Sequence, residues 1–165
     1  MSMKSTQADY WIKHLKLKPH PEGGYYNEVF RSEQQVKRAG ESQLKNSCTS
    51  IHYLLQNADF SSFHRLQSDE IWYFHVGSPL HIHILRPDGQ YEWKELSMNE
   101  TGSLSVIIEA GMWFAAEIPS RVGFSLSSCV VAPGFEFSEF ELGEKEKLLE
   151  IYPAQAELIE RFCLK

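Results

Sequence analysis

Short β-strand patterns separated by turn signals fill the middle of this chain of 165 residues. Apolar, aromatic and β-branched residues recur in runs of four to ten, which predicts strands at about 48–55, 60–66, 70–76, 80–86, 91–96, 104–109, 112–117, 122–131 and 135–142. The turn signals between them include Gly77-Ser78-Pro79, Pro87-Asp88-Gly89 and Ala132-Pro133-Gly134. Because a parallel sheet needs crossover helices and none is predicted between these runs, the strands must pair antiparallel in a sandwich or barrel.

The two ends of the chain have helical patterns. Apolar residues at helical spacing after Asp9 predict a short helix that ends by Pro19, followed by a Pro- and Gly-rich turn and a strand at about 26–31. Residues 32–46 are polar and predict a surface loop. Near the C-terminus, residues 144–149 and 154–164 predict helices on the outside of the β body. We expect one domain over 1–165, with an N-terminal helix and strand at 8–32, a barrel at about 48–142 and helices at 144–164.

Composition excludes several classes of function. Lys plus Arg number 16 against 22 Asp plus Glu, giving a net charge of −6, and the chain has no basic run for binding nucleic acid. No apolar stretch approaches the roughly 20 residues of a membrane-spanning helix, and Met1–Ser5 has no signal-peptide pattern. The three cysteines are widely spaced, without a CxxC pair, and predict reduced thiols in a cytoplasmic protein.

Seven histidines are the feature that suggests chemistry, because clustered imidazoles can hold a metal or transfer protons. The informative stretch runs from Ser62 to Gly77 and resembles the first motif of the cupin superfamily, in which His-x-His precedes a Glu and then a Gly. His64, Glu70 and Gly77 occupy three of these positions, but Leu66 stands at the second histidine. In the second motif, Gly111 is kept while Phe114 stands at the histidine. Two of the usual four metal ligands therefore remain.

The chain as a whole is similar to an uncharacterised family, the fifth cupin domain family. The similarity rests on four segments: His20-Pro21-Glu22-Gly23-Gly24-Tyr25-Tyr26 with Glu28 and Arg31-Ser32; Phe63-His64-Arg65 with Ser68-Asp69-Glu70-Ile71-Trp72; Gly111-Met112-Trp113-Phe114-Ala115-Ala116; and Val131-Ala132-Pro133-Gly134-Phe135-Glu136-Phe137. The resemblance implies an all-β, antiparallel jelly-roll β-barrel, commonly a homodimer, with an inward-facing pocket. The wider superfamily includes nucleotide-sugar epimerases, dioxygenases and metal-free binding proteins. Tyr73 departs from the family pattern, which is expected to have His there.

Strand alternation suggests which side chains face the pocket, because successive residues point to opposite faces. Ser62, His64 and Leu66 are expected on one face of their strand, and Glu70, Trp72 and Phe74 on one face of the next. We therefore predict an inward-facing catalytic pair in which His64 is the base and Glu70 orients it. The predicted ligand-binding residues around that pair are Ser62, Trp72, Phe74, Phe114 and Arg31.

Other readings of these residues stay open. Two ligands are too few for a stable metal site, so no metal or other cofactor is predicted, although a metal held by His64 and Glu70 with borrowed ligands is the alternative. His81 and His83 are expected to point outward, to solvent or a dimer face, because Leu80, Ile82 and Ile84 form the core side of their strand. Arg31 can bind an anion or pair with Glu28.

The Gly pair of Pro21-Glu22-Gly23-Gly24 more simply permits positive φ at a tight turn than it contacts a ligand, and His20 beside it is not expected to be catalytic.

Three functions are compatible with these patterns. The first is a small-molecule-binding cupin with metal-independent acid/base chemistry, such as epimerisation or isomerisation of a sugar or sugar nucleotide, an expectation that rests on superfamily analogy. The second is a non-enzymatic binding or sensor protein that uses the same pocket. The third is a metal-dependent oxygenase or isomerase.

Overall fold

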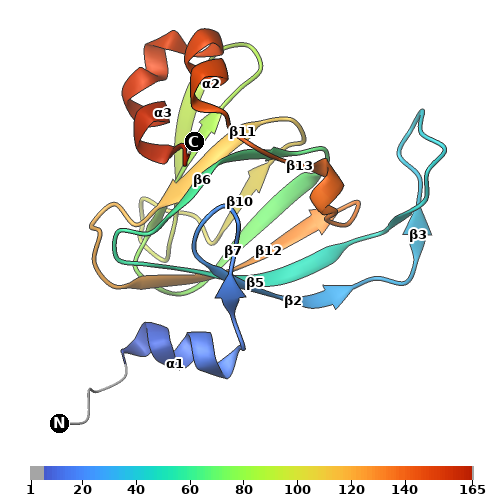
Figure 1. The fold of residues 1–165 in the computed structure, drawn as a ribbon. Coiled ribbons are helices and arrows are strands. Elements are labelled where there is room, and N and C mark those ends of the chain that lie inside the picture. The colour runs from blue at the N-terminus through green and yellow to red at the C-terminus, as the bar shows by residue number, and fades with distance from the viewer. Residues whose placement is uncertain (1–5, 165) are drawn as a thin grey trace.

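The computed structural model describes residues 6–164, which form two antiparallel sheets with helices at both ends (Figure 1). Within these residues, a six-stranded sheet has the order β1-β2-β5-β12-β7-β10 and a five-stranded sheet has the order β13-β6-β11-β8-β9. The strands of the six-stranded sheet are β1 (Lys18–Pro19), β2 (Tyr25–Arg31), β5 (Thr49–Gln56), β12 (Phe124–Ala132), β7 (Asp69–Gly77) and β10 (Ser105–Ile108). Those of the five-stranded sheet are β13 (Phe140–Leu142), β6 (Phe60–Leu66), β11 (Trp113–Glu117), β8 (Leu80–Leu85) and β9 (Tyr91–Leu96). The predicted antiparallel jelly-roll is thus confirmed.

Apart from the two-residue β1, which was not predicted, the predicted strands agree closely with the observed ones, with two differences. The expected strand at 135–142 is a 3₁₀ turn, η1 (Phe137–Glu139), followed by the short β13. The expected loop at 32–46 contains a small hairpin of β3 (Gln35–Val36) and β4 (Lys45–Asn46), which projects from the barrel in Figure 1. Ion pairs hold these two segments together: Arg38 and Lys45 of the segment 32–46 pair with Glu139 of η1. An apolar sequence pattern cannot indicate such ion pairs.

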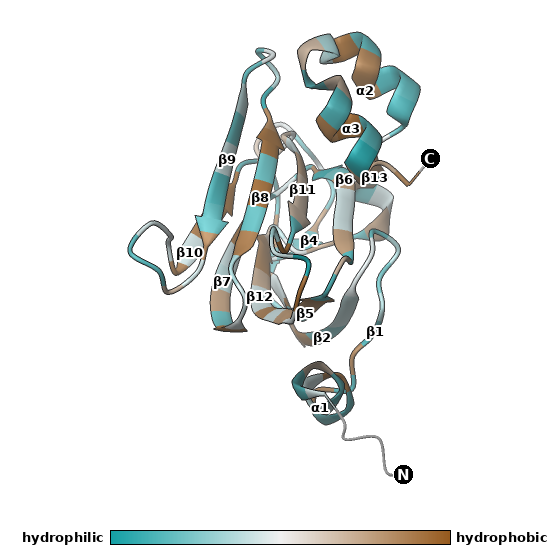
Figure 2. Cartoon of the chain, turned by 90° about the vertical axis from the view of Figure 1, so that its left-hand side faces the viewer, coloured by the Kyte–Doolittle hydropathy of each residue, from teal (hydrophilic) through white to brown (hydrophobic). Residues whose placement is uncertain are grey.

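The main core fills the space between the two sheets. It is built from alternate residues of facing strands, including Leu55, Trp72, Ile82 and Ile84, each nearly inaccessible to solvent. Along β8, Figure 2 shows the resulting alternation of hydrophobic and hydrophilic residues. This packing leaves one end of the barrel for the polar cavity described below.

The helices cover two separate parts of the barrel (Figure 2). Helix α1 (Gln7–His14) packs its apolar side on Leu54, Phe124 and Leu126 of the six-stranded sheet. Helices α2 (Lys145–Ile151) and α3 (Ala156–Phe162), joined by the 3₁₀ turn η2 (Pro153–Gln155), cover the outer face of the five-stranded sheet. None of the described helices is long and apolar enough to cross a membrane.

A β-bulge in β6 changes which residues face the barrel interior. His64 pairs with Phe114, but Ser61 pairs with Ala116, so β6 has one more residue than β11 between these two pairs. The extra residue reverses the alternation around Ser62. Ser62 therefore does not share the inward face of His64, contrary to the sequence prediction; its hydroxyl donates a 2.9 Å hydrogen bond to the carbonyl of Phe162 at the end of α3.

The packing of α3 gives a stability prediction. Ile159 is fully buried against the outer face of the five-stranded sheet. Ile159→Ala should lower the free energy of unfolding by about 2–5 kcal/mol, because it removes buried methyl groups and leaves a cavity. Chemical denaturation measures the loss.

Ile151 of α2 is the matched control, because it is 58% exposed. Ile151→Ala should change the free energy of unfolding by no more than about 0.5 kcal/mol. Equal losses for the two variants would show that α3 does not pack on the barrel as described.

Candidate functional site

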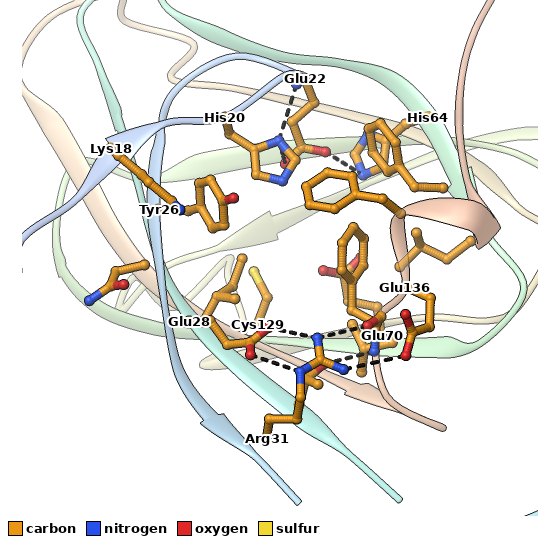
Figure 3. Close-up of a pocket in the computed structure, with 18 residues that line it drawn as sticks. Lys18, His20, Glu22, Tyr26, Glu28, Arg31, His64, Glu70, Cys129 and Glu136 are labelled. Carbon is orange, nitrogen blue, oxygen red and sulfur yellow. Dashed lines mark hydrogen bonds and ion pairs between the residues drawn. The ribbon is translucent and has the colours of Figure 1, made fainter. Parts of the chain in front are cut away.

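A cavity of about 270 Å³ opens at one end of the barrel (Figure 3). Strands β1, β2, β5, β6, β7 and β12 contribute to its walls, as do the turn before β2 and the segment around η1. Its lining residues are Lys18, His20, Glu22, Tyr26, Asn27, Glu28, Arg31, Thr49, Ile51, His64, Leu66, Glu70, Cys129, Val131, Phe135, Glu136, Phe137 and Phe140. The cavity therefore combines an apolar and aromatic wall with several ionisable groups, which is the usual composition of a small-molecule site.

The turn at His20–Gly24 places a carboxylate inside this cavity. Gly23 and Gly24 both have positive φ, as predicted, and a Cβ atom on Gly23 would collide with the carbonyl of Phe60. The close approach lets the Ser62 amide donate to the Glu22 carbonyl at 2.7 Å, and the Tyr53 hydroxyl donate to the Gly23 carbonyl at 2.6 Å. These bonds fix Glu22, 4% exposed, against β6.

Glu22 is the partner of His64. Its Oε2 lies 2.8 Å from His64 Nε2, and the other ring nitrogen, Nδ1, lies 2.7 Å from the Ser62 carbonyl oxygen. A carbonyl oxygen only accepts, so Nδ1 carries a proton and donates it. With a carboxylate on Nε2 as well, both nitrogens of His64 are engaged and the imidazolium form fits the site.

The electrostatics of this buried pair favour opposite charges. Burial disfavours the charged form of His64, but the attraction and hydrogen bond of Glu22 outweigh it and raise the pKa of His64 above 6.5. For Glu22, burial raises the pKa, while His64 and then His20 lower it, with a net pKa below 4.5. Both shifts favour the ionised forms, so the electrostatics stabilise an ion pair between the two residues.

Glu70 has a different environment on β7. It is 6% exposed, and its Oε2 is buried without a hydrogen-bond partner among the described residues. Burial raises the pKa of Glu70 to about 7; His64 opposes this rise, Glu22 reinforces it, and the polar groups of the Trp72 and Cys129 side chains oppose it further. Glu70 is therefore a carboxyl group that gains and loses its proton near neutral pH.

The predicted pairing of His64 with Glu70 is wrong in its contacts. No hydrogen bond or ion pair joins the two side chains in residues 6–164, although both line the cavity and interact electrostatically. Strand alternation correctly predicted that both face inward. It could not reveal that Glu22, from a turn more than forty positions earlier, takes the histidine.

The predicted ligand-binding residues are divided between the cavity and the core. Arg31 lines the cavity, whereas Ser62, Trp72, Phe74 and Phe114 are not part of its wall. Trp72 and Phe114 are core residues about 1% exposed, and Phe74 packs against the same core. Phe114 still supports the site from behind, because its ring centroid lies 4.0 Å from that of His64.

Arg31 is held at the cavity mouth by groups of the protein itself. Its Nη2 donates to Glu28 Oε2 at 2.8 Å and to the Phe135 carbonyl at 2.9 Å, and its Nη1 lies 3.5 Å from Glu136 Oε1. The guanidinium thus ties β2 to the segment after β12 (Figure 3). Of the two readings of Arg31, the structure shows the pairing with Glu28.

Two cavity residues, His20 and Glu22, are assigned no function by the sequence patterns. Two signals were present: the segment is one of the four that carry the family resemblance, and its Pro21-Glu22-Gly23-Gly24 indicates a tight turn, but neither shows which strand the turn meets. The carboxylate's partner depends on contact between distant segments, and a local pattern does not encode it.

The predicted orientation of His83 on β8 is correct, but its predicted exposure is wrong. His83 points away from the barrel core, as predicted, but it is 6% exposed because α3 covers it. Its Nδ1 lies 2.8 Å from the Tyr91 hydroxyl and its Nε2 lies 3.0 Å from Glu117 Oε1. His83 is therefore part of a buried polar contact beneath α3 and not a solvated residue.

The cavity does not fit a resident divalent metal of the kind common in cupins. Leu66 and Phe114 occupy two positions where such proteins have metal-binding histidines, and both nitrogens of His64 are already engaged. Among residues 6–164, no group of three or more His, Cys, Asp or Glu side chains has the geometry to hold a metal ion.

The fold and the cavity define a class of protein: a jelly-roll barrel with an ionisable cavity at one end. The family described as "Cupin superfamily (DUF985)" matches residues 9–143, and the chain belongs to this family. No functionally curated protein matches the sequence.

Solved structures agree with the family assignment. A hypothetical protein from Leishmania major is 32% identical, with a TM-score of 0.88, over 97% of this chain and 99% of its own. A protein from Shewanella oneidensis is 35% identical, with a TM-score of 0.86, over 98% of both chains. Oxalate decarboxylase from Bacillus subtilis shares the fold alone: it is 16% identical, with a TM-score of 0.55, over 87% of this chain and 36% of its own.

The Glu22–His64 ion pair gives a pH-dependent prediction. Glu22→Gln should lower the free energy of unfolding by about 3 to 5 kcal/mol at pH 5.5, because it leaves a buried imidazolium without its counter-charge. The pKa of His64 is higher in the folded protein than in the unfolded chain. The ion pair therefore contributes its full stability below pH 6.5 and loses it as the pH rises through the folded-state pKa of His64. The difference between wild type and variant should therefore shrink between pH 5.5 and 8.5, as measured by urea denaturation.

Glu144→Gln is the control for this experiment, because the Glu144–Lys147 pair is exposed on α2. It should change stability little at either pH. A loss for Glu22→Gln that is identical at pH 5.5 and 8.5 would contradict a charged His64.

Glu70 gives a second pH-dependent prediction of the same sign, over a lower pH range. Its pKa is raised to about 7 in the folded protein, so wild-type stability falls as the pH rises from about 4.5 to about 7 and the unfolded chain ionises first. Because glutamine does not ionise, Glu70→Gln removes this fall in stability with rising pH. The stability of the variant relative to wild type should rise over that pH range and level off above it, whereas exposed Glu109→Gln should show no such rise. A flat difference for Glu70→Gln would refute the raised pKa.

Proposed function

We propose that this protein binds a small polar molecule in the barrel cavity and transfers a proton on it without a metal. The observation that supports this proposal best is the buried Glu70 carboxyl, whose Oε2 makes no hydrogen bond of normal geometry to the described residues and which lines the open-ended cavity together with His64. A buried polar atom without a partner costs free energy, and a bound ligand would supply the missing hydrogen bond.

In this proposal, the roles of the predicted pair are exchanged. His64 is a poor base, because Ser62 and Glu22 engage both of its nitrogens. Glu70 is the proton acceptor and donor, and its pKa of about 7 suits both directions of transfer at neutral pH. His64 contributes a fixed positive charge that stabilises negative charge developing on the ligand.

The cavity favours a neutral, hydroxyl-rich ligand of about monosaccharide size. Its volume of about 270 Å³ is near the lower end of ordinary ligand sites. Arg31 is already neutralised by Glu28 and Glu136, so it offers little to an anion. The reaction to test first is isomerisation or epimerisation of a sugar; a nucleotide attached to that sugar would extend past the mouth, near Lys18.

A second candidate function is non-enzymatic binding in the same cavity. The observation that favours it is that protein groups already bind both nitrogens of His64 and the guanidinium of Arg31, so these two residues have little capacity left for a reaction. The third candidate, a metal-dependent oxygenase or isomerase, has no support in the donor set described above. Homodimerisation and a cytoplasmic location stay predictions from the sequence.

A ligand screen followed by a turnover assay tests the proposal. Sugars, nucleotide sugars, keto acids and aromatic acids are first screened by thermal shift, and the hits are incubated with protein dialysed against a chelator. We expect at least one sugar-class hit and its conversion, followed by NMR. Glu70→Gln should reduce the conversion by about 10²-fold or more while binding persists.

Glu109→Gln is the control, because Glu109 is exposed and lies outside the cavity wall. Binding of a hit without conversion of any hit would support the non-enzymatic function and contradict the catalytic one. Activity that disappears on chelation and returns with added metal would overturn the metal-independent mechanism.

A further inference from the structure

His20 has a fixed protonation pattern at the cavity wall. The backbone N–H of Glu22 donates to His20 Nδ1 at 3.1 Å. Because Nδ1 accepts this hydrogen bond, the proton of the neutral ring must be on Nε2. Nε2 has no hydrogen-bond partner in residues 6–164, and Figure 3 shows it turned from the Glu22 backbone toward the centre of the cavity.

Aromatic rings hold the His20 imidazole in this orientation. Tyr26 contacts it edge-on with ring centroids 4.5 Å apart, and Phe140 and Tyr53 contact it in the same manner at 5.8 and 6.1 Å. The side chain is 9% exposed. Its Nε2–H is therefore an oriented donor that does not have to reorganise to meet a ligand.

The surroundings of His20 keep it neutral. Burial lowers its pKa below 6.5; Glu22 opposes this effect and the positive charge of His64 adds to it. The Nδ1–Glu22 Oε1 distance of 3.7 Å is longer than a hydrogen bond, and Glu22 Oε2 is bound to His64. Of the two cavity histidines, one is thus a charged group saturated by the protein and the other is a neutral donor available to a ligand.

We propose that His20 is the electrophile for an α-hydroxy carbonyl substrate, donating its Nε2–H to the carbonyl oxygen while Glu70 moves the neighbouring carbon-bound proton. This inference rests on the proposed function, because it uses Glu70 as the acid/base group, and it narrows the substrate class to hydroxy aldehydes and hydroxy ketones. His20, His64 and Glu70 all line the cavity drawn in Figure 3, so a ligand that fills it can contact both His20 and Glu70.

The reaction balances within the substrate and the protein. The Glu70 carboxylate takes the proton from the α-carbon, the C–H electron pair forms a carbon–carbon double bond, and the carbonyl π pair moves to oxygen. The resulting enediolate oxygen is stabilised by the His20 N–H and by the charge on His64. A neutral imidazole paired with a carboxylate base is a known arrangement for enolisation.

Protonated Glu70 then returns the proton to the same carbon, or to the former carbonyl carbon. In the second case, a proton passes from the neighbouring hydroxyl to the enediolate oxygen and an isomeric carbonyl forms. No oxidant, reductant or further reactant is needed. A single acid/base group suffices, in contrast to a two-base epimerisation.

Deuterium exchange measures this step directly. Dihydroxyacetone, erythrulose and xylulose are incubated with the protein in D₂O at neutral pD, and loss of the α-proton signal is followed by ¹H NMR. We expect exchange on at least one ketose. His20→Phe should slow it by about 10²-fold or more, His20→Gln should restore part of the rate because its amide keeps an N–H donor, and Glu70→Gln should abolish it.

His14→Phe is the matched histidine control, since His14 is exposed on α1 and lies outside the cavity wall, and it should exchange at the wild-type rate. The thermal unfolding of each variant, and its binding of the ketose, are first compared with those of the wild type. If His20→Phe is unfolded, His20→Gln is used in its place. A His20 variant with the wild-type rate, while Glu70→Gln is inactive, would overturn the role of His20 and leave the proposed function standing. Absence of exchange by wild type would overturn the substrate class, and full activity of Glu70→Gln would overturn both proposals.

Discussion

The contact between Glu22 and His64 is the interaction on which the cavity depends. It joins a turn near the N-terminus to strand β6, at a distance of 2.8 Å between two side chains that are almost inaccessible to solvent. Burying either charge alone would cost several kcal/mol. The attraction between the two charges offsets this cost. The same pair fixes the protonation of His64, adds positive charge beside His20, and leaves Glu70 as the ionisable group without a hydrogen-bond partner on Oε2.

This arrangement shows how a cupin barrel without histidines at two of the usual metal-ligand positions still has an ionisable cavity. Leu66 and Phe114 make the former ligand positions apolar, and Phe114 packs against His64. The buried ionisable groups His20, Glu22, His64 and Glu70 come from three different elements: the turn before β2, strand β6 and strand β7. Their electrostatic coupling gives neighbouring groups different protonation states, which is a common property of acid/base sites.

Much of the fold followed from the sequence, because alternating apolar residues and turn signals are local. The same alternation correctly placed His64 and Glu70 inward. It failed at Ser62, where an added residue in β6 reverses the faces. At His83 it gave the correct face but could not show that α3 covers that face. Local patterns could not find His20 and Glu22 as site residues, because their contacts join segments that are distant in the chain.

The protonation of the two cavity histidines tests the proposed electrostatics most directly, by ¹⁵N NMR of the imidazole nitrogens at pH 6.5. His64 should be mostly charged, with protons on both nitrogens, because its pKa is raised above this pH. His20 should be mostly neutral, with its proton on Nε2, because its pKa is lowered. A neutral His64 together with a charged His20 would contradict the assignment of a saturated ion pair and a free neutral donor.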